Sequence, residues 1–319
     1  MERRVDILAV GNLVWEVTAL LPDLSSEPEI DVAGASRVAE NALQVVLNGG
    51  GSAANALVAA AAQGMRCVLV GRAGDDDEGR RSLESLRQAG VDARVDLMPG
   101  RRTKRSWILK EAGTDRGTFR VEVPPRSAPA VRACDVPDDL VLGARVLHLD
   151  RVSATGLTLA RRRAASGLAV TLDLHDAPRR TGGLDRLRDL LPCLAMIQVG
   201  EGAAADLSGR WGLPRDHASF AATMCQHVPR VVVTLGASGA VGCERGARPL
   251  FVPATAPRTL VDSTGAGDAF AAAVLSGMLR GEGWDRTLRG ASDAGARACE
   301  ALGARGRPQD CTRVATAST

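Results

Sequence analysis

Tyrosine is absent from this chain of 319 residues, and phenylalanine and tryptophan occur only four times each. A binding site that depends on stacking against an aromatic ring therefore has few residues available. Long hydrophobic stretches are also missing, because no apolar run approaches the roughly 20 residues that a membrane-spanning helix needs. The hydrophobic content of 45% and the charged content of 24% are ordinary for a soluble globular protein.

Charge and cysteine usage exclude further classes. The formal net charge of +3 is too small to indicate a nucleic-acid partner, and basic runs such as residues 161–163 are typical of solvated faces. The seven cysteines contain no Cys-x-x-Cys pair, which favours free thiols over a disulfide framework or a zinc site. The first residues lead into a short apolar strand and not into a signal-peptide core. We therefore expect a cytoplasmic protein without nucleic-acid or membrane partners.

The order of apolar segments predicts an α/β fold. Short apolar segments alternate with helical stretches from residue 146 onward, which is the pattern of parallel βαβ units with right-handed crossovers. Ligands of such sheets bind beyond the carboxyl ends of the strands. The expected strands are residues 5–11, 67–71, 146–149, 169–173, 196–199 and 230–234, and the expected early helices are residues 52–62 and 79–89.

Two segments interrupt this pattern. Residues 12–47 lack helical periodicity, and residues 98–124 alternate and carry charges, which indicates loops and exposed strands. We expect these two segments to form a small β-rich lid. The remaining ranges, 1–11, 48–97 and 125–305, would form the α/β core, and residues 306–319 a frayed tail.

Residues 262–268, with the sequence Asp-Ser-Thr-Gly-Ala-Gly-Asp, carry the clearest chemistry. They lead into a run of helical character, and bare amides at a helix N-terminus form an anion site. A carboxylate repels a bound phosphate unless it takes a proton from a hydroxyl that attacks this phosphate. The segment therefore indicates an anion hole with a general base, although an aspartate can also simply cap a helix.

Four motifs in order resemble the PfkB family of carbohydrate and nucleoside kinases, the ribokinase-like kinases. Besides residues 262–268, they are residues 50–55 (Gly-Gly-Ser-Ala-Ala-Asn), 74–79 (Gly-Asp-Asp-Asp-Glu-Gly) and 234–239 (Thr-Leu-Gly-Ala-Ser-Gly). The resemblance implies a three-layer α/β/α fold with a mostly parallel central sheet and a small β-rich lid. It also implies ATP and Mg²⁺ as cofactors, with a monovalent cation as a further option near Thr264.

The resemblance assigns roles to individual residues. Asp268 would be the catalytic base, and the amides of Gly265, Ala266, Gly267 and Asp268 would form the anion hole. The substrate hydroxyls would contact Glu16, Gly50, Gly51 and Asn55. The nucleotide would contact Thr234, Gly236, Gly239, Thr264, Asp293 and Gly303. Taken alone, residues 50–55 and 234–239 would also be read as tight turns.

Two positions depart from the family pattern. The family carries Asn-x-x-Glu after the strand that holds Met196, where the pair organises magnesium, and the corresponding residues here are Gly200 and Ala203. Glu201 is the remaining candidate ligand, since Mg²⁺ is often held by one or two carboxylates and substrate phosphates. The second departure is Glu16, which is one methylene longer than the aspartate of the family and so affects substrate choice.

We therefore expect an ATP-dependent kinase acting on a hydroxyl of a sugar or sugar-like polyol. A nucleoside kinase of the same family is one alternative, disfavoured by the scarce aromatic residues, with Trp15 and Trp107 as candidates for stacking. A non-catalytic sugar-binding pseudokinase is the other, suggested by Gly200 and Ala203. The sequence identifies neither the acceptor nor the oligomeric state. A homodimer formed through the lid is one option for the oligomeric state.

Overall fold

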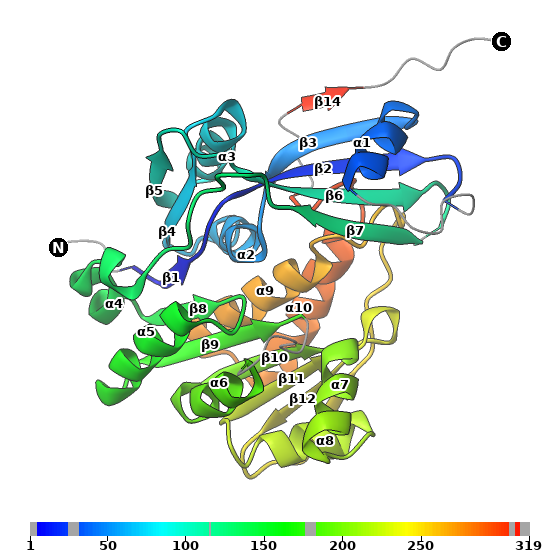
Figure 1. Cartoon of the computed structure of the whole chain (residues 1–319). Helices are drawn as coiled ribbons and strands as arrows, with labels where there is room; N and C mark the ends of the chain where they lie inside the picture. Colours follow the sequence, from blue (N-terminus) through cyan, green and yellow to red (C-terminus); the bar gives the residue numbers. More distant parts are fainter. Residues whose placement is uncertain (1–4, 25–31, 115, 176–182, 306–309, 313–319) are drawn as a thin grey trace.

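The computed structural model describes residues 5–24, 32–114, 116–175, 183–305 and 310–312. Two β-sheets organise this part of the chain (Figure 1). The larger, sheet A, has nine strands in the described residues and is parallel except where β12 and β13 join it. Its order is β13 (Leu250–Val252), β12 (Ala240–Glu244), β11 (Arg230–Thr234), β10 (Met196–Gly200), β9 (Ala169–Leu174), β8 (Val146–Leu149), β1 (Ile7–Val10), β4 (Cys67–Gly74) and β5 (Asp92–Met98).

Helices cover both faces of sheet A, as expected for parallel strands that are apolar on both sides. Strand β1 shows the reason, because Ile7 and Ala9 enter one hydrophobic cluster and Leu8 enters the other. One face carries α2 (Ser52–Ala61), α3 (Asp77–Gln88), α9 (Ala266–Arg280) and α10 (Trp284–Ala298). The opposite face carries α4 (Asp138–Gly143), α5 (Ala154–Ala165), α6 (Gly183–Leu190), α7 (Glu201–Trp211) and α8 (His217–Met224). The predicted three-layer architecture is therefore confirmed.

Sheet B is smaller and lies beside the start of α9 (Figure 1). Its order is β14 (Asp310–Thr312), β3 (Gln44–Gly50), β2 (Val14–Leu21), β6 (Lys104–Glu111) and β7 (Gly117–Glu122). One face of this sheet packs Trp15 and Trp107 into an apolar cluster with Ala35 of α1 (Val32–Glu40). The other face carries polar residues toward a cavity. Both segments expected to form a lid contribute strands to this sheet.

Three details differ from the expectations. Residues 32–40 form α1, although prolines and the lack of periodicity in this segment suggested no helix. The helix is stabilised by packing on sheet B, and local helix propensity does not reveal this stabilisation. Strand β3 continues to Gly50, so the expected boundary after residue 47 falls inside a strand. In the expected tail, Asp310–Thr312 pair with β3 as β14, and the rest of 306–319 lies outside the described residues.

Among the described residues, no helix combines the length and the apolar character needed to cross a bilayer.

Candidate active site

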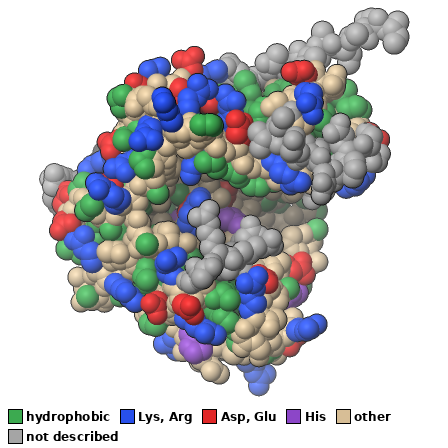
Figure 2. Space-filling view, in the orientation of Figure 1, with side chains coloured by type: hydrophobic (Ala, Val, Ile, Leu, Met, Phe, Trp, Pro, Cys, Tyr) green, Lys and Arg blue, Asp and Glu red, His purple; other side chains and the backbone are tan. Residues whose placement is uncertain are grey.

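A cavity of about 790 Å³ opens between sheet B and the starts of α2 and α9. Figure 2 shows the molecule hollowed between the part that carries sheet B and the part that carries sheet A. Segments more than 200 residues apart in sequence meet here, because strand ends of sheet A and one face of sheet B converge. Of the predicted site residues, the cavity is lined by Glu16, Gly51, Asn55, Thr264, Gly265, Gly267 and Asp268.

The turn before α9 leaves backbone amides without partners. Gly265 has a φ of 79°, and a Cβ there would lie 2.5 Å from the Ala304 carbonyl oxygen, so only glycine fits. Among the described residues, no acceptor pairs with the N–H of Gly265, Gly267 or Asp268. The N–H of Ala266, in contrast, donates to the Ser263 carbonyl at 3.1 Å, so Ala266 is not a free donor as expected. Three unpaired amides at a helix N-terminus can bind an anion, and we refer to this turn as the anion site.

The Asp268 side chain lies at this turn and is 7% exposed. Its Oδ2 accepts a hydrogen bond of 3.1 Å from the Asn55 amide nitrogen. Its Oδ1 is buried and has no hydrogen-bond partner. The His175 ring nitrogen Nε2 lies 3.4 Å from this oxygen, which is longer than a usual N–H···O hydrogen bond, so a hydroxyl entering the cavity would supply the missing donor. The carboxylate is therefore placed to accept a proton from a bound hydroxyl.

Asn55 is held by a residue that the sequence analysis missed. Arg305 donates from Nε to Asn55 Oδ1 at 2.9 Å and from Nη1 to Ser85 Oγ at 2.7 Å. Because the guanidinium can only donate, it fixes the Asn55 amide with Nδ2 toward Asp268. Asn55 thus orients the predicted base, although we expected it to contact sugar hydroxyls. Arg305 lies 250 residues from Asn55 in sequence, and no local pattern indicated the contact.

Glu16 of β2 faces the cavity and is 4% exposed. Its Oε1 accepts a hydrogen bond of 3.1 Å from the Ala304 amide. Burial, with smaller contributions from Asp268 and Asp262, raises the pKa of Glu16 to about 7 against the opposing effects of the Ala304 amide and Arg305. The second carboxylate oxygen lies next to Gly50, since a Cβ there would be 3.0 Å from Oε2. Glu16 therefore borders the predicted substrate glycines.

Thr264 does not fit the expected monovalent cation. Its hydroxyl donates to Asp262 Oδ1 at 2.7 Å, and its amide donates to the same oxygen at 3.0 Å. The Gly303 amide donates to Asp262 Oδ2, and the Lys110 ammonium lies 3.5 Å from Oδ1. The Asp262 side chain is fully buried, so a lysine from sheet B already balances the charge that would attract a cation.

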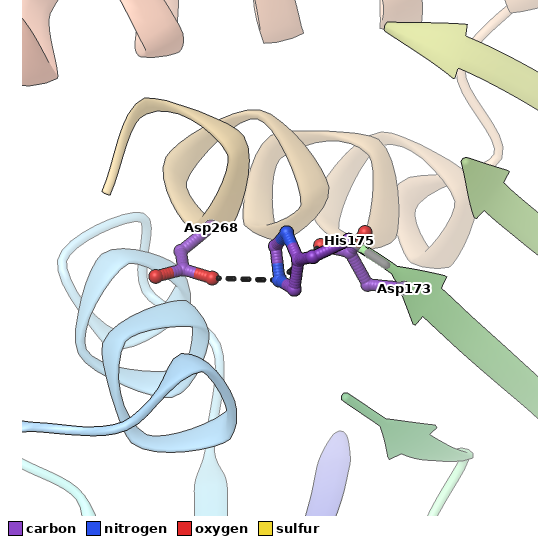
Figure 3. A group of neighbouring side chains, drawn as sticks. All are labelled: Asp173, His175 and Asp268. Carbon is purple, nitrogen blue, oxygen red and sulfur yellow. Dashed lines mark ion pairs between the residues drawn. The ribbon is translucent and has the colours of Figure 1, made fainter. Parts of the chain in front are cut away.

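His175 follows β9 and lies between two carboxylates (Figure 3). Its Nε2 is 3.4 Å from Asp268 Oδ1 and 3.5 Å from Asp173 Oδ2. Burial lowers the pKa of His175, but the two carboxylates outweigh burial and raise the pKa to about 10. These side chains are close enough to hold a metal ion, with ligand atoms within 4.8 Å, but a protonated ring has no lone pair to offer. The sequence analysis missed His175, although its place directly after a parallel strand was a usable signal.

Of the predicted nucleotide residues, Thr264 lines this cavity and the other five do not. Thr234, Gly236 and Gly239 form the turn between β11 and β12, at the same edge of sheet A. Gly239 is required by the fold, because its φ is 115° and a Cβ would lie 2.1 Å from the Val252 carbonyl oxygen. Asp293 of α10 accepts from the Thr255 hydroxyl at 2.6 Å.

Gly303 lies elsewhere than expected. Its amide contacts Asp262, and a Cβ there would be 3.9 Å from Glu16 Oε1. This position is beside the anion site and sheet B, on the side of the cavity that the predicted substrate residues line. We therefore do not retain Gly303 as a contact of adenine.

The expected metal ligand is also apart from the cavity. The Glu201 side chain is 60% exposed and lies 3.7 Å from His217 Nε2 of α8. Gly200 carries no ligand, and Ala203 is buried in the apolar cluster of the α4–α8 face. Among the described residues, these positions therefore do not fit a magnesium ion held by the protein, and the phosphates of a nucleotide would have to hold it.

A model of the pfkB family of carbohydrate kinases matches residues 23–310 of the chain. The chain belongs to the PfkB family. The match contains all four motifs and strands of both sheets, with β1 and β2 lying before it, and it confirms the resemblance expected from the sequence. Members of this family transfer a phosphoryl group to a hydroxyl acceptor, and the chain is therefore a sugar or nucleoside kinase.

Individual PfkB proteins show the range of acceptors. The chain is 29% identical over 308 residues to the ATP-dependent ribose-1-phosphate kinase of Halopiger xanaduensis, covering 95% of each sequence. It is 28% identical over 270 residues to the aminoimidazole riboside kinase of Salmonella typhimurium, covering 79% of this chain and 81% of that one. The adenosine kinase of Sinorhizobium meliloti has the same fold, with a TM-score of 0.80 at 23% identity over 95% and 96% of the two chains.

Proposed function

We propose that this protein is an ATP-dependent kinase that transfers the γ-phosphoryl group to a hydroxyl of a sugar or sugar-like polyol. The observation that carries the proposal is Asp268, whose buried Oδ1 makes no hydrogen bond in the described residues and lies beside the free amides of Gly265, Gly267 and Asp268, with His175 Nε2 as an ion-pair neighbour at 3.4 Å. A hydroxyl donor and an anionic phosphate, side by side, would satisfy both groups. Use of ATP is supported by the similarity of this chain to an ATP-dependent ribose-1-phosphate kinase.

The reaction follows from this arrangement. The acceptor hydroxyl gives its proton to Asp268 as its oxygen attacks the γ-phosphorus, and the bond from that phosphorus to the β-phosphate oxygen breaks. The negative charge on the transferred group faces the three amides, which need no reorganisation. Asn55, fixed by Arg305, holds Asp268 in place. Magnesium, carried by the nucleotide, would neutralise phosphate charge.

The nucleotide and acceptor would occupy opposite sides of the anion site. Glu16, Gly51 and Ser106 line the acceptor side and offer polar groups to hydroxyls. The turn at residues 234–239 is our proposed nucleotide side, because it follows a strand of sheet A at the edge where ligands of such sheets bind. A cytoplasmic location and a homodimer through sheet B stay predictions from the sequence.

A nucleoside kinase is the second candidate, favoured by an apolar wall on sheet B. Phe119, Val121 and Val123 line the cavity and are 57%, 48% and 61% exposed. A nucleobase offers a flat apolar face that would cover such a wall. Trp15 and Trp107, considered for this role from the sequence, instead pack on the opposite face of sheet B.

A panel of acceptors separates these functions. Purified protein would be given ATP with single sugars, cyclitols, sugar phosphates and nucleosides, and ADP formation and the phosphorylated product would be measured. We expect the protein to phosphorylate a neutral polyol. Phe119→Ala should change the rate of this turnover by less than about threefold. Turnover only with nucleosides, lost in Phe119→Ala, would support the second candidate. Binding of ATP and a polyol without any product would contradict the proposed activity.

A further inference from the structure

Within the described part of the chain, one ring nitrogen of His175 faces two carboxylates and the other makes no hydrogen bond. Nε2 faces Asp268 and Asp173, at 3.4 and 3.5 Å (Figure 3). A protonated imidazole has a second donor at Nδ1. Among the described residues, no acceptor bonds to this nitrogen. The side chain is 40% exposed and lines the cavity, so a ligand can reach it.

The ring lies against the anion site. A Cβ on Gly267 would be 3.7 Å from His175 Cε1 and 3.9 Å from Nδ1. Gly267 contributes one of the three free amides, so an anion at this turn would lie next to the ring. Gln198 of β10 connects Asp173 with the start of α9. Its amide nitrogen donates to Asp173 Oδ2 at 3.1 Å and to the Gly267 carbonyl at 3.2 Å.

The surroundings of the ring favour its positive charge. Burial opposes the charge, whereas Asp173 of β9, Asp268 of α9 and Asp150 after β8 raise the pKa of His175 to about 10. His148 of β8 also acts on the ring, and burial lowers the pKa of His148 to about 4. His148 is therefore neutral at pH 7 and does not repel the His175 ring. The protonated His175 ring is therefore a cation that faces the cavity.

Two further cations line the cavity besides His175 and Lys110: Lys104 of β6, and Arg151, whose guanidinium donates to both carboxylate oxygens of Asp150. The family's polar pair after β10 is replaced by Gly200 and Ala203, and Glu201 lies near His217. Lys110 balances Asp262, and Arg305 is bound to Asn55 and Ser85. A transferring phosphoryl group needs charge stabilisation at its equatorial oxygens. His175 is placed to supply it.

We propose that His175 is a further catalytic residue whose imidazolium donates from Nδ1 to the transferring phosphoryl group, while Asp173 holds the ring against the anion site. This inference rests on the proposed kinase function. The ring donates a hydrogen bond and keeps its proton throughout. The proton of the acceptor hydroxyl goes to Asp268, and the oxygen–phosphorus bonds form and break as described above.

Two substitutions of the ring test its role. His175→Asn and His175→Gln should lower kcat about 10²-fold, as the loss of one transition-state donor does elsewhere, with the KM for the acceptor changed less than about threefold. His175→Arg keeps a cation and should recover part of the kcat. His227→Asn, at an exposed turn, is the control and should leave kcat unchanged.

The pH dependence separates a catalytic role from a structural one. Asp173→Asn removes a carboxylate that raises the pKa of His175, so the alkaline limb of kcat should move to lower pH by more than about one pH unit. In Asp173→Asn with His175→Arg this limb should disappear, because arginine stays charged. An unmoved limb in Asp173→Asn would overturn the proposal.

Other outcomes are equally decisive. A kcat for both His175→Asn and His175→Gln within twofold of wild type would overturn the inference while leaving the kinase function intact. Loss of kcat with unchanged unfolding in urea, together with recovery by arginine, would support it. Failure of the kinase function would instead appear in the wild-type protein, as absence of turnover on every acceptor.

Discussion

Replacing Glu16 by glutamine tests the electrostatics of the acceptor side. The side chain is buried, and its pKa is raised from 4.5 to about 7, chiefly by burial. A raised pKa means that the folded protein favours the protonated carboxyl more than the unfolded chain does. For this group, the stabilising contribution is complete below pH 4.5 and is lost as the pH rises to about 7.

The size of the effect follows from the two pKa values. The difference between 4.5 and about 7, at about 1.4 kcal/mol per pH unit, is about 3 kcal/mol of unfolding free energy. Ionised Glu16 therefore costs about this much above pH 7. Glutamine keeps the shape and still accepts the hydrogen bond from Ala304, but it carries no charge to bury.

We expect Glu16→Gln to be close to the stability of wild type at pH 4 and to exceed it by up to about 3 kcal/mol at pH 8. Urea unfolding at the two pH values, followed by tryptophan fluorescence, measures the difference. Glu84→Gln, at an exposed position of α3, is the control and should show the same small change at both pH values. The KM for the acceptor should rise in Glu16→Gln. A variant that is less stable than wild type at pH 8 would refute the reasoning.

Three further outcomes are expected. Gly265→Ala should lose activity and more than about 2 kcal/mol of unfolding free energy, because the added Cβ would meet Ala304. Gly281→Ala, also at a positive φ (71°) but with open space around it, should lose only about 1 kcal/mol. Equal urea midpoints for the two variants would contradict this expectation. Lys110→Met should lower the unfolding free energy by about 3 kcal/mol, because the charge of the buried Asp262 is then uncompensated. Adding Asp262→Asn should recover part of this loss of stability. An unchanged stability of Lys110→Met would show that the ion pair makes no net contribution to stability. Amide hydrogens of β6 and β7 should exchange more slowly with acceptor and nucleotide bound, and equal exchange would count against a lid.

Local periodicity was enough to predict six of the nine described strands of sheet A, but β5, β12 and β13 were not among the expected strands. Its strands are short apolar runs separated by helical stretches, and this pattern reports burial on both faces. Helix α1 was missed because its stability comes from packing on sheet B. Strand β14 was missed for a similar reason, since its partner β3 lies about 260 residues away in sequence.

In the candidate site, too, residues within one local motif could be predicted from the sequence, whereas contacts between distant elements could not. Asp268 and Gly265 were predictable, because the turn chemistry is written in seven consecutive residues. Arg305 and Lys110 were not, because each acts through a single contact between distant elements. The structure also narrows the anion hole, since the Ala266 amide is occupied by a carbonyl that sequence could not place.

The central claim is that Asp268 takes the proton of the acceptor, and Asp268→Asn tests it directly. The substitution keeps the size of the side chain and removes its basicity. We expect turnover to fall by about 10²–10⁴ while ATP binding, measured by calorimetry, and the urea midpoint stay close to wild type. Asp285→Asn, at an exposed position of α10, should keep full turnover. If Asp268→Asn keeps more than a tenth of wild-type turnover while chemistry is rate-limiting, Asp268 is not the base.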